Sequence, residues 1–170
     1  KLRHNGRRYL LQSLLAGIVL LGILLVEDSV DRAAVVAAIA STAFVLFMMP
    51  QSSMATPKKV LGGHLIALCI GSGFAAFGGQ SALVLASEGA GAVGASILLM
   101  SITDMEHTPA AGTALAVVSH GFSWSLVVLL TSSIVTMVVI HQLFRRWLVD
   151  LDGGCLLRYF LIVRRIGGPV

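Results

Sequence analysis

Charged side chains are scarce in this chain. Only 12% of its 170 residues are Asp, Glu, Lys or Arg, whereas 56% are hydrophobic. A water-soluble domain of this length could not bury so much apolar surface, which excludes an ordinary globular protein. Long apolar runs are typical of transmembrane helices, so the composition predicts an integral membrane protein.

Basic residues are absent from the whole middle of the chain. No Lys or Arg occurs between Val60 and Phe144. All basic residues except Arg32 lie near the N-terminus, at Lys58 and Lys59, or after Phe144. The positive-inside rule places these three regions, and hence both termini, in the cytoplasm, with the chain in a plasma or inner membrane. The net charge of +4 follows from this asymmetry and gives no reason to expect a nucleic acid partner.

Cysteine pairs and catalytic motifs are also missing. Cys69 lies in an apolar segment and Cys155 in a basic tail, so neither a disulfide nor a metal site is expected. The chain contains no Gly-x-Ser-x-Gly, no His-Glu-x-x-His and no phosphate-binding loop motif. The sequence therefore predicts a protein that is not an enzyme and holds no cofactor or metal.

The apolar runs predict an all-α bundle of about five membrane-spanning helices. These runs cover residues 9–26, 33–49, 60–77, 81–102 and 123–143. A further run, 109–119, would form a helix of roughly 16 Å, too short for about 30 Å of hydrocarbon. Five crossings alone would put the termini on opposite sides, against the charge pattern. The short run is therefore predicted to be a broken or re-entrant helix.

One construction occurs twice: an apolar helix, a polar loop, then Thr-Pro opening a second apolar helix. The two units cover residues 38–64 and 90–116, with Thr56-Pro57 and Thr108-Pro109 in register. Proline suits the first turn of a helix, so each loop should end at a helix start with free N–H groups. Such a start is a candidate seat for an anion. We expect a transmembrane domain over residues 1–147, followed by a basic cytoplasmic tail, 148–170, that is either interfacial or disordered.

The polar residues of the two Thr-Pro turns are the candidate substrate ligands. The set, with one nearby histidine, is Ser52, Ser53, Thr56, Pro57, His64, His107, Thr108 and Pro109. The hydroxyls have an alternative role as helix N-caps. His64 lies about two helical turns after Pro57 and should face the same way, although a membrane histidine often only bonds a neighbouring helix.

Three acids are candidates for gating or proton coupling: Glu88, Asp104 and Glu106. An acid within a membrane is costly unless it is paired or hydrated, which favours a functional role. The alternative is that all three are solvated surface residues.

Two segments resemble the HPP family of integral membrane proteins. Residues 107–115, His-Thr-Pro-Ala-Ala-Gly-Thr-Ala-Leu, resemble the family signature His-Pro-Pro-Ala-Gly-Ala-Thr-Ala-Leu. Residues 50–64, Pro-Gln-Ser-Ser-Met-Ala-Thr-Pro-Lys-Lys-Val-Leu-Gly-Gly-His, are similar to the family block Pro-x-Ser-x-x-Ala-x-Pro-x-x-x-x-Gly-Gly-His. The chain departs from the signature at Thr108, where the family has proline, and in the order of the small residues that follow Pro109.

The resemblance implies a small membrane protein, usually with about four spanning helices, whose plastid relatives are associated with nitrite transport. The leading hypothesis is therefore a transporter or channel for a small inorganic anion, nitrite-like, bound at the two helix starts. The alternatives are a non-transporting sensor or assembly module, and a proton or cation pathway through the acids. The expected partners are the anion, membrane lipids and, from the glycine-rich helices, further copies of the chain.

Overall fold

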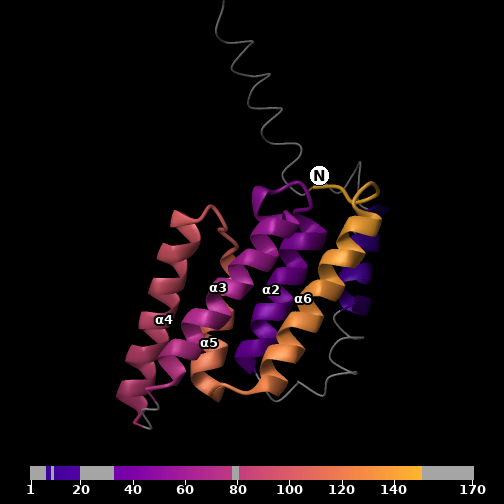
Figure 1. The fold of residues 1–170 in the computed structure, drawn as a ribbon. Helices are drawn as coiled ribbons and strands as arrows, with labels where there is room; N and C mark the ends of the chain where they lie inside the picture. Colours follow the sequence, from indigo (N-terminus) through magenta and orange to yellow (C-terminus); the bar gives the residue numbers. More distant parts are fainter. Residues whose placement is uncertain (1–6, 9, 20–32, 78–80, 151–170) are drawn as a thin grey trace, which may run out of the picture.

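The computed structural model describes residues 7–8, 10–19, 33–77 and 81–150 (Figure 1). These residues form α-helices and one 3-10 turn, and no strand occurs among them. The elements are the helix Leu10–Val19, α2 Ala33–Met48, η1 Ser53–Ala55, α3 Pro57–Ala75, α4 Ala82–Ile102, α5 Thr108–His120 and α6 Trp124–Phe144. The second half of the first predicted span and nearly all of the predicted tail lie outside the described residues.

Local sequence signals explain where the helices begin. The side chains of Ser81 and Ser123 accept hydrogen bonds from the backbone at the starts of α4 and α6, as N-caps do. Helix α3 begins at Pro57, as the Thr-Pro turn predicts and three residues before the apolar run that starts at Val60, because proline is well suited to the first helical position. Helix α5 ends at Gly121, whose φ of 74° is a conformation that glycine adopts without strain.

Described segments from the first helix, from the end of α2 and the turn after it, and from the chain after α6 meet at one end of the bundle. Gln12 Nε2 donates to the carbonyl oxygens of Phe47 at 2.8 Å and Val149 at 2.9 Å. The Gln51 backbone N–H donates to Asp150 Oδ2 at 3.0 Å. These bonds join the first helix, the end of α2 and the segment after α6, at the upper end of Figure 1. Residues 148–150, the part of the predicted tail that the structure describes, therefore pack against the bundle.

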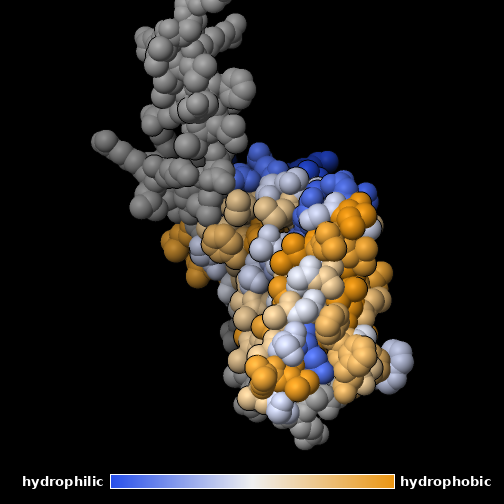
Figure 2. All heavy atoms as spheres, turned by 90° about the vertical axis from the view of Figure 1, so that its left-hand side faces the viewer, coloured by the Kyte–Doolittle hydropathy of each residue, from blue (hydrophilic) through white to orange (hydrophobic). Residues whose placement is uncertain are grey.

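Two described helices, α4 and α6, are long and apolar enough to cross a membrane, with 21 residues each. Their large apolar side chains are widely exposed, among them Leu83, Leu98 and Val128. Figure 2 shows one side of the bundle, where hydrophilic residues gather mainly at the upper end and hydrophobic residues cover much of the surface below. This distribution fits contact with lipid over the apolar length of the helices.

Helix α5 is shorter than its neighbours and begins below the end of the bundle. Its 13 residues give about 20 Å of helix, two residues more than predicted and still too short to span hydrocarbon. The loop before it lies against α3: a Cβ atom added at Gly63 would be 3.0 Å from both Met105 O and His107 Cβ. Gly63 is about 9 Å along α3 from its start. Asp104, with a φ of 54°, turns the chain out of α4 toward Gly63 of α3.

Helix α5 packs against α2, α3 and α4, and glycine makes its approach to α3 close. A Cβ atom at Gly71 would lie 2.8 Å from Ala114 O and 3.0 Å from Val117 Cβ, whereas one at Gly73 would meet nothing within 4 Å. Small residues of this kind let helix backbones approach one another in lipid.

We expect Gly71→Ala to destabilise the bundle by about 1–3 kcal/mol, because the methyl group forces α3 and α5 apart. Gly73→Ala is the matched control on the same helix and should be neutral or stabilising by up to about 1 kcal/mol. The measurement is the midpoint of thermal unfolding in detergent, followed by size-exclusion chromatography. Equal midpoints for the two variants would contradict the close contact at Gly71.

Candidate functional site

Two buried histidines from different helices face each other inside the bundle. His64 lies in α3 and His107 is the N-cap residue of α5. Their side chains are 2% and 1% exposed, and their ring centroids are 5.2 Å apart. Burial of two imidazoles in a membrane protein requires partners for their nitrogen atoms.

Two buried threonines supply those partners. Thr42 of α2 places Oγ1 3.0 Å from His64 Nε2 and 3.5 Å from His107 Nε2. Thr113 of α5 places Oγ1 2.8 Å from His64 Nδ1. We call these four residues, Thr42, His64, His107 and Thr113, the His–Thr cluster. It joins α2, α3 and α5 at the level where α5 begins.

The His–Thr cluster also ties the two Thr-Pro turns together. His107 Nδ1 donates to the carbonyl oxygen of Met54, in the turn before α3, at 2.9 Å. The hydroxyl of Thr108 lies 3.3 Å from the sulfur of the same methionine. The imidazole of His107 therefore bonds the other turn and does not cap its own helix. The two turns, 52 positions apart in the sequence, meet in space.

The hydroxyls of the first turn serve local structure. Ser52 Oγ accepts from the Met54 backbone N–H at 3.3 Å, as the cap of η1. Thr56 Oγ1 donates to the carbonyl oxygen of Ser53 at 3.0 Å. Ser53 and Thr56 are exposed, and Pro57 occupies the first position of α3. These four candidates lie at the end of the bundle, outside the His–Thr cluster.

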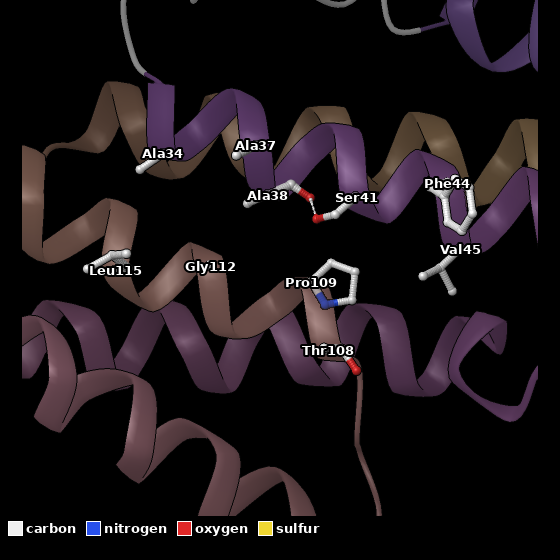
Figure 3. A pocket seen from close by; sticks show the side chains of 10 residues that line it. All are labelled: Ala34, Ala37, Ala38, Ser41, Phe44, Val45, Thr108, Pro109, Gly112 and Leu115. Atoms are coloured by element: carbon white, nitrogen blue, oxygen red, sulfur yellow. Dashed lines mark hydrogen bonds between the residues drawn. The ribbon is translucent and has the colours of Figure 1, made fainter.

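Thr108 and Pro109 line a groove of about 580 Å³ between α2 and α5 (Figure 3). Figure 3 places Pro109 across from Ser41, in the middle of α2. A smaller cavity of about 200 Å³, between α3 and α6, is lined by His64 and Thr131. Cavities therefore border the His–Thr cluster region on two sides.

The three candidate acids lie outside the His–Thr cluster. Asp104 Oδ1 is 2.9 Å and Glu106 Oε2 is 2.8 Å from Lys59 Nζ. The hydrogen bond from Lys59 holds the pKa of Asp104 below its usual value. The side chains of the two acids are 75% and 50% exposed. Glu88 is half-buried in α4. It lies about 21 Å along the helix from Ile102, the end of α4 that precedes Asp104.

We expect Lys59→Gln to loosen the loop before α5, because both acids lose their cation. Hydrogen exchange of the backbone amides at residues 103–107 should become faster, while the thermal midpoint should change little, since exposed ion pairs contribute little to stability. Lys58→Gln serves as the matched control, because Lys58 forms no ion pair among the described residues. Unchanged exchange in Lys59→Gln would show that the loop is held by other contacts.

Sequence reasoning did not identify Thr42 and Thr113 as site residues. Each is a hydroxyl within an apolar helix, and membrane helices carry many hydroxyls that bond only their own backbone. Ser41, Ser72 and Ser119 do so here. Thr113 lies within the segment that resembles the family signature, which could have singled it out, whereas only the packing of α2 against His64 distinguishes Thr42 from such residues.

The chemistry of the His–Thr cluster is that of neutral hydrogen-bonding groups. Imidazole and hydroxyl can donate to an oxyanion, and no carboxylate lies among the four side chains. Within the described ranges, no group of three or more His, Cys, Asp or Glu side chains could hold a metal ion. The geometry provides donors deep in the bundle and keeps its acids near the surface.

Comparison with known proteins places this architecture in a family. Residues 1–150 match the family described as HPP, transmembrane region. A transmembrane protein of Dictyostelium discoideum is 27% identical over 146 residues, which cover 76% of this chain and 50% of that protein. The chain thus spans about half the length of this curated relative. No solved structure matches the chain. Because the family match covers most of the sequence, including both Thr-Pro turns, the chain belongs to the HPP family of transmembrane proteins.

Proposed function

We propose that this protein carries a small monovalent inorganic anion, nitrite-like, across the membrane, as a transporter or channel. The observation that carries the proposal is the His–Thr cluster itself. An ionisable side chain inside a membrane bundle is costly to bury and is a candidate member of a substrate pathway. Two of them, with two threonines, converge here where a short helix begins at depth.

The donor set favours an anion over a cation. The start of α5 bears the positive end of its helix dipole, which stabilises negative charge nearby. Imidazole N–H and threonine O–H groups, which bond partners within the bundle here, can donate to the oxygen atoms of an oxyanion when they exchange those partners. A cation pathway through the acids would need Asp104 and Glu106 as ligands, yet both are bound to Lys59. This arrangement argues against the proton or cation pathway through the acids.

The proposed topology has five crossings and the short helix α5, with both termini in the cytoplasm of a cell with a plasma or inner membrane. The bonds of Gln12 to Phe47 and Val149 support it, because they join segments close in sequence to the basic regions at one end. The two units 38–64 and 90–116 would then be an internal repeat whose Thr-Pro turns form two halves of one site, with Ser52, Ser53 and Thr56 at its cytoplasmic entrance.

Flux measurements in proteoliposomes test the proposal. The purified chain should move nitrite down its gradient faster than protein-free liposomes do, and nitrate, formate and chloride define the selectivity. Potassium flux should equal the background. If no anion moves, the non-transporting sensor or assembly module becomes the better explanation. A cation current without anion dependence would instead support a cation pathway.

A further inference from the structure

The hydrogen atoms of the His–Thr cluster can be assigned from the backbone oxygens that it contacts. A carbonyl oxygen only accepts, so Nδ1 of His107 carries a proton and donates it to Met54 O at 2.9 Å. For the same reason the hydroxyl of Thr42 donates to Ala38 O at 2.8 Å. The single proton of Thr42 is then used, and Oγ1 can only accept from the two histidines.

The remaining contacts follow from this assignment. Nε2 of His64 donates to Thr42 Oγ1 at 3.0 Å, so Nδ1 of neutral His64 accepts the hydroxyl proton of Thr113 at 2.8 Å. In one contact neither atom has a hydrogen to donate. Nε2 of neutral His107 and Thr42 Oγ1, 3.5 Å apart, face each other with their lone pairs. This is the longest contact of the His–Thr cluster. One added proton on Nε2 of His107 would complete it.

No unpaired positive charge lies beside this nitrogen among the described residues. Helix α2 and the turn η1 contain no charged residue. The titratable groups of α3 are Lys58, Lys59, His64 and Cys69, of which Lys58 is exposed at the end of the bundle, in the first turn of the helix. The others around His107 are Asp104 and Glu106 of its own loop, and Glu88 and His120 toward the far ends of α4 and α5. Lys59 is bound to both acids of the loop. An anion entering the cluster would therefore meet dipoles but no compensating charge.

We propose that the anion and one proton bind together, with the proton on Nε2 of His107, so that transport is electroneutral symport. This inference rests on the proposed function and adds that anion transport is coupled to the movement of a proton. A lone anion and a lone imidazolium are each disfavoured in a buried site, whereas each stabilises the other. A second proton is excluded, because the two imidazole rings are only 5.2 Å apart and like charges would repel.

The proton balance of the cycle is simple. Nε2 of His107 takes a proton from water on the side of entry, as the anion enters the cluster. It returns the proton to water on the side of exit, when the anion leaves. No other bond is made or broken, and one proton crosses with each anion.

Proteoliposomes with a pH-sensitive dye inside and a potassium gradient clamped by valinomycin test the coupling. An inward nitrite gradient should acidify the lumen by about one proton per anion, and an imposed membrane potential should leave the flux unchanged. Protein-free liposomes measure the leak of nitrous acid, and nitrate provides an anion without that leak. Nitrite flux that follows the potential and carries no protons would overturn the symport and leave anion transport standing. Absence of any anion flux would overturn both.

His107→Asn tests the role of the nitrogen. The asparagine amide can keep the bond to Met54 O in place of Nδ1, but it offers no group that takes a proton at the position of Nε2. We expect nitrite flux to fall at least tenfold and the residual flux to lose its dependence on pH. A folded variant with proton-coupled flux of normal size would refute the assignment to His107. If this variant does not fold, the number of protons that the wild type carries per anion still decides whether transport is symport.

Discussion

Replacing His107 with alanine is expected to reduce anion flux at least tenfold. The substitution removes the imidazole that contacts Thr42 and the bond that ties the second Thr-Pro turn to Met54. A tenfold loss corresponds to about 1.4 kcal/mol of lost stabilisation along the transport path. This free energy is about that of one or two hydrogen bonds, and His107 forms its bonds where the two turns meet. The measurement is the initial rate of nitrite uptake at equal protein density in the liposomes.

His120→Ala is the matched control, because His120 lies at the other end of the same helix and is exposed. It should transport like the wild type. Both variants must elute as single species, since His107→Ala also loses a buried bond. Normal flux in a well-folded His107→Ala variant would remove the His–Thr cluster from the transport path.

Thr42→Val is expected to lower the free energy of unfolding by about 2 kcal/mol. The two side chains have nearly the same shape, but valine leaves one nitrogen of His64 buried without a partner, which costs about 1–3 kcal/mol. For a chain of this size the thermal midpoint should fall by about 4–8 °C. Anion flux should fall as well, because Thr42 is the one residue of the cluster that contacts both histidines.

Ser41→Ala provides the comparison for Thr42→Val. Ser41 is the adjacent residue on α2, is exposed, and bonds only the carbonyl oxygen of Ala38 in its own helix. Removal of its hydroxyl should change the free energy of unfolding by less than about 0.5 kcal/mol, as for most surface substitutions, and so leave the thermal midpoint nearly unchanged. Equal midpoints for the two variants would show that Thr42 does not support the imidazoles.

The helices of this protein could be predicted from its sequence because their signals are local. Apolar runs between serine caps, prolines and glycines place α2, α4 and α6 within one residue of the predicted ends. The short helix after His107 follows from the charge pattern, since only an extra segment reconciles the basic regions at both ends of the chain. Pro57 moves the start of α3 earlier than its hydrophobicity alone indicates.

The composition of the site was only partly predictable. Of the predicted ligands, His64 and His107 enter the His–Thr cluster, whereas Ser52, Ser53 and Thr56 stay at the bundle end. The serines and threonines of a membrane helix look alike in sequence, because each can bond its own backbone. The acids illustrate the same point, since pairing of Asp104 and Glu106 with Lys59 spans more than 40 positions and leaves no local trace.

The sequence by itself determined that this is a helical membrane protein of the HPP type, with two Thr-Pro turns. These properties depend on composition and on neighbours along the chain. Only the tertiary structure decided which side chains meet. Gly63 and Gly71 allow α5 and its loop to press against α3, and that approach brings Thr113 to His64, whereas Thr42 reaches His64 from α2. Such contacts depend on how closely helices pack, which no local pattern specifies.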